Sequence, residues 1–214
     1  MAREVAAVRN AVGGIEIANF AKHEFKGFGA RAYLNRLLAR HIPRAGRLSL
    51  TSMLTPQGRL YGDLTIACLV EDHFMLIGSG SMQEAHRRWF EASLPSDVAY
   101  SNASDLWHGI ALSGPKSRDL LAKICRDDVS GLALKFRDTR HCFVGGVPVI
   151  LNRISFSGEL GFEIYCRPHY LCPPPRALTP PTIPSPIAPV MWSVIPTPLT
   201  SASVLTSPFP EPEF

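Results

Sequence analysis

Two acidic residues inside strand-like stretches are the positions where the chain could do chemistry. Asp63 lies in LYGDLTIACL, between Tyr61 and Thr65, and Glu163 lies in GFEIYC. A carboxylate in a strand can accept hydrogen bonds from a ligand or act as a general base. It can equally belong to the solvent-exposed face of an antiparallel strand. The residues alone leave both interpretations open.

Alternation along each stretch predicts which side the two carboxylates take, because successive side chains of a strand point to opposite faces. Asp63 should share a face with Tyr61 and Thr65, and Glu163 should share one with Tyr165. The opposite faces are apolar and are the candidate core faces, formed by Leu60, Leu64, Ile66, Cys68, Phe162, Ile164 and Cys166.

Other common sites do not match the sequence. GSGSMQ, which begins at Gly78, lacks the third Gly of a dinucleotide loop and the Lys of a P-loop. Ser157 in FSGELG does not fit the nucleophile elbow. The seven His lack metal-ligand spacing, and the five Cys are odd in number without a CxxC pair, so we expect neither a metal site nor a disulfide framework.

The length, composition and charge of the chain limit the kinds of partner that it could bind. The chain has 214 residues, 46% of them hydrophobic, and a formal charge of +4. That length suits one domain or two small ones. The longest basic run is Arg87-Arg88, which argues against a nucleic-acid patch. No apolar run approaches the roughly 18 residues of a membrane span, and the first 14 residues do not resemble a secretory signal.

Composition changes sharply after residue 171 and predicts two regions, 1–171 and 172–214. The second region holds 13 of the 19 Pro, which block helices and sheet ladders. We expect a disordered or polyproline II-like tail, with PxxP spacing from Pro181 to Pro184 as a weak docking signal. A second hypothesis is that this tail is not native coding sequence and that the chain is truncated, mis-spliced or frame-shifted.

Helical and strand-like patterns alternate in mixed order over residues 1–171. This order predicts an α+β fold with mixed, largely antiparallel sheets and flanking helices. Ser81 with Glu84 forms a capping-box pattern, and Gly145-Gly146 marks a turn. The predicted helices are 3–12, 29–41, one from Ser81, and one from Gly114-Pro115 to Ile124; the predicted strands are 15–26, 47–54, 60–70, 73–78, 106–112, 143–154 and 162–166.

Four stretches in order resemble a known family. They are IANFAKHEFKGFGARAYLNRL, MLTPQGRLYGDLTI, FMLIGSGSMQEAHRRWFE and RISFSGELGFEIY, between residues 17 and 165. They resemble the folate-binding aminomethyltransferase domain of glycine cleavage T-protein. They resemble more closely the C-terminal half of dimethylglycine and sarcosine dehydrogenases. The likeness runs from about residue 4 to about residue 170, and it implies the same fold, here incomplete.

The resemblance implies a role for each candidate residue. Tetrahydrofolate would occupy a central cavity, with Asp63 as the catalytic base or electrostatic partner near its reactive nitrogens. Glu163 would accept hydrogen bonds from the pterin's amino and ring N–H groups. Thr65 and Gly78 would lie near the ligand. Phe156 replaces a frequent Tyr of the family, so it would keep the ring contact and lose a hydroxyl hydrogen bond.

The implied activity is transfer of a one-carbon unit to tetrahydrofolate, with an iminium from a methylated glycine as donor. The chain has no GxGxxG near its N-terminus, so we expect that it binds no FAD and depends on a flavoprotein partner. The mitochondrial matrix or the bacterial cytoplasm would suit it. Two alternatives stay open: a non-catalytic folate-binding or regulatory module that acts through a partner, and the glycine-cleavage aminomethyltransferase.

Overall fold

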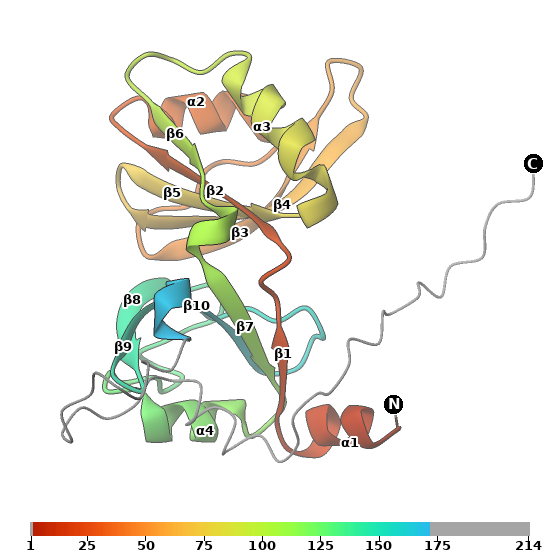
Figure 1. The fold of residues 1–214 in the computed structure, drawn as a ribbon, viewed down its shortest axis with the longest axis vertical. Helices are drawn as coiled ribbons and strands as arrows, with labels where there is room; N and C mark the ends of the chain where they lie inside the picture. Colours follow the sequence, from red (N-terminus) through yellow and green to blue (C-terminus); the bar gives the residue numbers. More distant parts are fainter. Residues whose placement is uncertain (1, 172–214) are drawn as a thin grey trace, which may run out of the picture.

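Two five-stranded antiparallel sheets form the centre of the computed structural model, which describes residues 2–171 (Figure 1). Sheet A has the order β1-β7-β10-β9-β8, with bounds Gly13–Glu16, His108–Ser113, Gly161–Cys166, Val147–Asn152 and Thr139–Val144. Sheet B has the order β3-β4-β5-β2-β6, with bounds Arg47–Leu54, Leu60–Val70, His73–Gly78, Ala21–Lys26 and Ala99–Asn102. The predicted α+β class with antiparallel sheets is confirmed.

Helices cover the outer faces of both sheets, so the layers run helix, sheet, sheet, helix (Figure 1). Helices α2 and α3 lie over sheet B, while α1 and α4 lie at the far end beside sheet A. The helices are α1 (Ala2–Asn10), α2 (Ala30–Leu37), α3 (Gln83–Glu91) and α4 (Ser117–Ile124), with short 3₁₀ turns at Gly80–Met82, Ser104–Leu106 and Pro168–Tyr170.

Three buried clusters fill the spaces between these layers. One joins α4 to sheet A through residues such as Leu121, Val144 and Phe162. A second joins α2 and α3 to sheet B. The third lies between the two sheets and contains Ile17, Leu48, Ala67, Leu69, Met75, Ile77, Ala103, Trp107, Ile150, Ile154 and Tyr165. We call this third cluster the inter-sheet layer.

Two predicted elements differ in the structure. The predicted strand 15–26 is two strands, because β1 pairs with β7 in sheet A while β2 pairs with β5 and β6 in sheet B. Ser81 does not cap a helix, since α3 begins at Gln83 and the Ser81 hydroxyl contacts Ser79 Oγ at 2.9 Å. The alternation of apolar residues continues through the crossing between the sheets, so the pattern could not show the break.

Other predicted elements are present in the structure, although some of their bounds differ. The Gly145-Gly146 turn joins β8 to β9 as a hairpin, although the predicted strand 143–154 begins too late and runs through this turn. Strand β6 was missed, because its four residues alternate between half-buried and exposed and carry little apolar signal.

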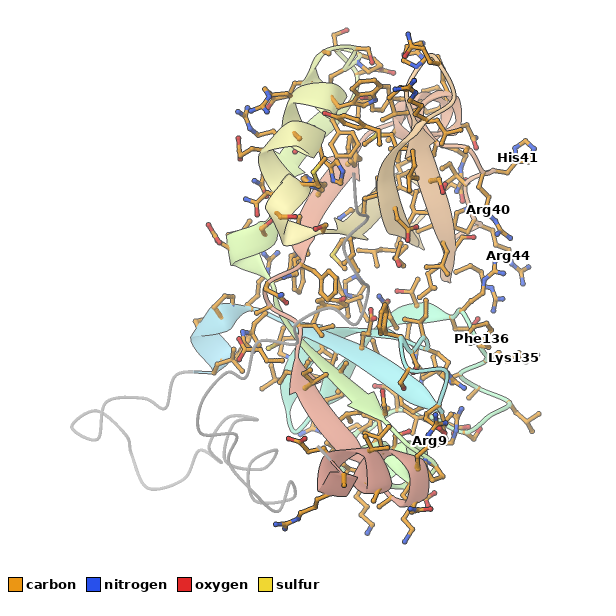
Figure 2. The ribbon with its side chains drawn as sticks, turned by 90° about the vertical axis from the view of Figure 1, so that its right-hand side faces the viewer. Arg9, Arg40, His41, Arg44, Lys135 and Phe136 are labelled. Atoms are coloured by element: carbon orange, nitrogen blue, oxygen red, sulfur yellow. The ribbon has the colours of Figure 1, made fainter. Side chains whose placement is uncertain are left out.

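Backbone hydrogen bonds connect the sheets along one side. Leu48 N donates to Arg137 O at 2.9 Å, and Thr139 N donates to Gly46 O at 3.0 Å. Arg47 and Asp138 form an ion pair at the same place. Figure 2 shows the exposed side chains Arg40, His41 and Arg44 projecting on the same side as Lys135 and Phe136.

A buried carboxylate connects the sheets elsewhere. Glu24 on β2 is 4% exposed and accepts a hydrogen bond from Trp107 Nε1 at 2.7 Å, just before β7. Lys26 Nζ lies 2.8 Å from the same carboxylate and His73 Nε2 lies 3.5 Å from it. The His73 imidazole, followed by Lys26 and Trp107, holds the pKa of Glu24 well below its usual value although burial opposes this.

Two glycines make room for a histidine between α3 and sheet B. His86 of α3 is 1% exposed. A Cβ added at Gly62 would lie 2.8 Å from His86 Nε2, and one added at Gly78 would lie 2.5 Å from Leu64 Cδ2. Both contacts are closer than a Cβ atom tolerates, so close packing against His86 at Gly62 and against Leu64 at Gly78 accounts for glycine at these positions.

We expect Glu24→Gln to lower the free energy of unfolding by about 1–3 kcal/mol at pH 7, because the amide loses the ion pair with Lys26 and weakens the buried hydrogen bond from Trp107. The depressed pKa makes the wild-type advantage complete above pH 4.5, the carboxyl's ordinary value. The advantage should disappear as the pH falls through the low folded-state pKa. Denaturant titrations at several pH values measure this, and the exposed Glu84→Gln is the control. An equal loss in both variants would contradict the buried role.

We expect Gly78→Ala to lower the free energy of unfolding by about 1–3 kcal/mol, because the new methyl group overlaps Leu64 in a filled core. Gly131→Ala is the matched control, since an added Cβ there meets nothing within 4 Å. The control should change stability by less than about 0.5 kcal/mol. Thermal and denaturant unfolding of both variants provide the measurement. A neutral Gly78→Ala would show that packing does not require glycine at this position.

Candidate functional site

Asp63 lies on the face of β4 that looks toward sheet A. Its side chain is exposed, and Thr65, two residues along the strand, is half-buried. Ala67 and Leu69 continue the same alternation and belong to the inter-sheet layer. This face of β4 therefore changes from apolar to polar along the strand. Asp63 lies beyond the end of the inter-sheet layer, where the face is open to solvent.

Tyr61 does not share this face, contrary to the prediction. Met53 pairs with Gly62 and Leu54 pairs with Leu60, which leaves Tyr61 as the extra residue of a β-bulge. Its ring packs on Trp89 of α3, with centroids 4.4 Å apart. A bulge adds one residue and reverses the alternation locally. The phenol therefore packs on the helix side of the sheet.

Glu163 occupies a central position in sheet A. It pairs with Ala111 on β7 and with Asn152 on β9. The Tyr165 hydroxyl donates to Glu163 Oε2 at 2.9 Å, and Tyr165 itself is fully buried in the inter-sheet layer. Burial raises the pKa of Glu163, while the donors on Tyr165 and Asn152 oppose that change. Glu163 is thus a half-buried acceptor at the margin of the inter-sheet layer.

Asn152 is the polar neighbour that sequence reasoning missed. Its Oδ1 accepts a hydrogen bond from Thr139 Oγ1 at 2.6 Å. Its Nδ2 is buried and makes no hydrogen bond of normal geometry to any residue in the described part of the chain. A buried donor that lacks a well-formed hydrogen bond lowers the stability of the fold. Asn152 and Glu163 together present a donor beside an acceptor. In the sequence, the one sign of this site was a polar residue at the end of the apolar run VPVILN.

The remaining candidates are placed differently. The missing side chain of Gly78 faces Leu64 and α3, so a ligand on the sheet A side would meet only its backbone. Phe156 lies between β9 and β10 and is fully exposed. Asp63 and Glu163 come from different sheets, and within residues 2–171 no hydrogen bond joins them to each other. The structure gives both carboxylates faces that border the same inter-sheet layer.

Membrane crossing by a helix has no support in the part of the chain that the structure describes. No helix there reaches the length and apolar character required to span a bilayer.

Comparison with known sequences gives a consistent set of relatives. The family model for the GCVT N-terminal domain matches residues 1–173. Mitochondrial dimethylglycine dehydrogenase of Mus musculus is 37% identical over 164 residues, which are 75% of this chain and 19% of that protein. An aminomethyltransferase of Bacillus cereus is 28% identical over 163 residues, which are 75% of this chain and 44% of that protein. The chain therefore spans about a fifth of the first relative and under half of the second.

Comparison with solved structures supports the same fold. The glycine cleavage system aminomethyltransferase T from Bartonella henselae gives a TM-score of 0.67 at 21% identity, covering 77% of this chain and 44% of that one. The heterotetrameric sarcosine oxidase from Corynebacterium sp. U-96 gives 0.58 at 19% identity, covering 79% of this chain and 84% of that one. Because the family model covers all of the described residues, the chain belongs to the GCVT N-terminal domain family and is homologous to dimethylglycine dehydrogenase and aminomethyltransferase.

Proposed function

We propose that the chain forms the tetrahydrofolate-binding, one-carbon-transfer region of a dimethylglycine dehydrogenase-like enzyme. Membership of the GCVT N-terminal domain family supports this. So does the higher identity to the mouse dimethylglycine dehydrogenase, 37% against 28% for the Bacillus aminomethyltransferase. The observation that carries the proposal is the polar pair Glu163 and Asn152 beside the inter-sheet layer.

That pair fits the edge of a pterin ring. A half-buried carboxylate can accept two parallel N–H bonds in a fork, which is the geometry that an amino group beside a ring N–H offers. The buried Asn152 Nδ2 lies beside Glu163 and makes no hydrogen bond of normal geometry among the described residues, so it would be available to donate to a ring acceptor. When bound, a reduced folate supplies amine nitrogens that take up a one-carbon unit. Glu163 and Asn152 would hold and orient it.

Asp63 is proposed as the residue that handles the proton. An amine attacked by an electrophilic carbon must lose a proton, and an exposed carboxylate beside it can accept that proton and stabilise nearby positive charge. Thr65 lies on the same face of β4 and would add a hydroxyl contact. Gly78 would allow close approach through its backbone, and Phe156 would contribute a ring face.

The one-carbon donor is proposed to be the iminium formed when a methylated glycine is oxidised. A flavoprotein partner would form it, and FAD would be held by that partner. The compartment is proposed from the relatives' names: the mouse protein is named mitochondrial and the Bacillus protein is bacterial. The mitochondrial matrix or the bacterial cytoplasm would therefore suit this chain.

A second candidate function is the glycine-cleavage aminomethyltransferase, in which the donor is an aminomethyl group on a lipoyl carrier. The fold shared with the Bartonella aminomethyltransferase and the 28% identity to the Bacillus protein favour it. Activity with an aminomethylated lipoyl carrier, but none beside a dimethylglycine-oxidising flavoprotein, would select this function over the first.

We expect Glu163→Gln to weaken binding of reduced tetrahydrofolate by about 10- to 100-fold, because one or more charge-assisted hydrogen bonds are lost. Calorimetric titration of the full chain measures it. The exposed Glu16→Gln on β1 of the same sheet is the control and should bind like the wild type. Equal affinity in Glu163→Gln, or no heat from the folded wild-type chain, would contradict the proposed site.

The same Glu163→Gln variant should not lose stability at pH 7. Burial raises the pKa of Glu163, so the folded protein binds its proton more tightly than the unfolded chain does. The carboxylate therefore costs stability as the pH rises above its ordinary value of 4.5. In denaturant unfolding from pH 4 upward, the free energy of unfolding of the variant should rise relative to that of the wild type. This separates lost binding from lost folding.

We expect Asp63→Asn to bind tetrahydrofolate nearly as well as the wild type while its transfer rate falls by at least about 100-fold, the usual contribution of a general base. The assay mixes the chain with a dimethylglycine-oxidising flavoprotein and reduced tetrahydrofolate, and follows the formaldehyde that escapes capture. Glu71→Gln, an exposed acid just beyond β4, is the control. Folate binding without any transfer by the wild type would instead support a non-catalytic module.

A further inference from the structure

Two thiols and a carboxylate converge at the end of α4, away from Asp63 and Glu163. They belong to Cys125, Asp127 and Cys142, and their ligand atoms all lie within 4.8 Å of one another. Cys125 directly follows α4 as its C-cap residue, and Cys142 lies on β8. Both thiols are free. The two cysteines are 17 positions apart in the chain, which explains why sequence spacing did not indicate a site.

Backbone contacts hold the three residues in place. Cys125 forms an isolated β-bridge with Val144. Arg126 N donates to Phe143 O at 3.2 Å, and Gly145 N donates to Ile124 O at 2.7 Å. These bonds continue the edge of sheet A onto the segment that follows α4. Rigid placement of this kind is what a preorganised metal site requires.

The Asp127 carboxylate is also oriented from behind. Phe143 N donates to Asp127 Oδ2 at 3.3 Å, which leaves the other oxygen of the carboxylate for a ligand. Carboxylates that ligate metal ions are themselves hydrogen-bonded in this way, and the hydrogen bond orients them toward the ion.

Two hollows meet at these side chains and give an ion access. One, of about 320 Å³, is lined by Asp127 and Cys142 among others. The other, of about 530 Å³, is lined by Cys125 and Asp127 among others. Asp127 is exposed, Cys125 is half-buried and Cys142 is buried. An ion could enter from solvent and meet a thiol on the protein side.

The electrostatics of the cluster favour a cation. Two thiolates and a carboxylate repel one another, and a bound cation removes that repulsion. The C-terminal end of α4 adds a partial negative charge. Arg126, which precedes Asp127 in the chain, and Arg118, which lines the larger hollow, are cations on the same surface.

We propose that Cys125, Asp127 and Cys142 bind one thiophilic divalent cation, with Zn²⁺ as the best match. Tetrahedral Zn²⁺ with bonds of about 2.3 Å to sulfur sets its ligand atoms about 3.8 Å apart, so the side chains must close by at most about 1 Å from the 4.8 Å limit. Thiolates and a carboxylate suit this ion, and one coordination position stays open to water or another ligand. Binding displaces the thiol protons into the buffer and involves no change of oxidation state.

A disulfide fits the arrangement less well. Cys125 is opposite Val144 in the bridge, so Cys142 lies two residues further along the partner strand. Such diagonal positions are typically about 7–8 Å apart, beyond the usual Cα separation of disulfide-bonded cysteines. At such a separation an ion could join the two thiols, whereas a direct S–S bond would require the backbone to move.

The test is titration of the reduced, metal-free full chain with Zn²⁺ against a chromophoric chelator, with Co²⁺ and Cd²⁺ as spectroscopic probes of thiolate ligation. We expect one equivalent to bind, to release protons and to raise the midpoint of thermal unfolding. Cys125→Ser should weaken binding by at least about 100-fold, and exposed Asp127→Asn should weaken it by at least about 10-fold, in line with loss of a ligand or its support.

Matched controls separate the site from general charge and thiol effects. Asp119→Asn removes an exposed carboxylate from the larger hollow, and Cys172→Ser removes a thiol outside the described residues; both should bind like the wild type. Absence of metal binding in the folded wild type would overturn the proposal. So would binding that survives both Cys125→Ser and Cys142→Ala, or a Cys125–Cys142 disulfide that forms readily in mild oxidant and is found by mass spectrometry.

Discussion

The apolar layer between the two sheets is the constraint on which the rest of the structure depends. It fixes which faces of sheets A and B oppose each other, and it contains Trp107, which donates a hydrogen bond to the buried Glu24. A carboxylate that is 4% exposed would destabilise such a layer if it lacked partners. The indole hydrogen bond and the neighbouring Lys26 make it an anchor between the sheets instead. Once the sheets are held in this way, residues from distant parts of the chain border one shared layer.

The candidate site follows from where that layer ends. On β4 the apolar residues Ala67 and Leu69 give way to Thr65 and then Asp63. On β10 the buried Tyr165 gives way to Glu163. The Tyr165 hydroxyl therefore orients Glu163 from its packed side, while Asp63 is exposed where a ligand can approach. The raised pKa of Glu163 and the absence of a well-formed hydrogen bond at Asn152 Nδ2 are both unfavourable for stability alone, as expected where function competes with packing.

The side of sheet A that packs on α4 carries the second candidate site. There the edge strand β8 is joined to the end of α4 by backbone hydrogen bonds, which also cover an edge that would otherwise be open to pairing with another chain. The thiols of Cys125 and Cys142 with the Asp127 carboxylate lie at this junction. A bound ion would fasten α4 to the sheet and would leave the faces that carry Asp63 and Glu163 unchanged. The two sites can therefore be tested independently.

The local pattern of the sequence determined the α+β class, most of the strands, the Gly145-Gly146 hairpin and the family, because alternation, turn residues and ordered motifs are properties of neighbouring residues. It also placed Asp63 and Glu163 on strands. It did not show the crossing within residues 15–26 or the bulge at Tyr61, and it gave no sign that Asn152 adjoins Glu163 or that Cys125 approaches Cys142. Strand register, bulges and contacts between distant segments are decided by how the layers pack, and only the tertiary structure contains that information.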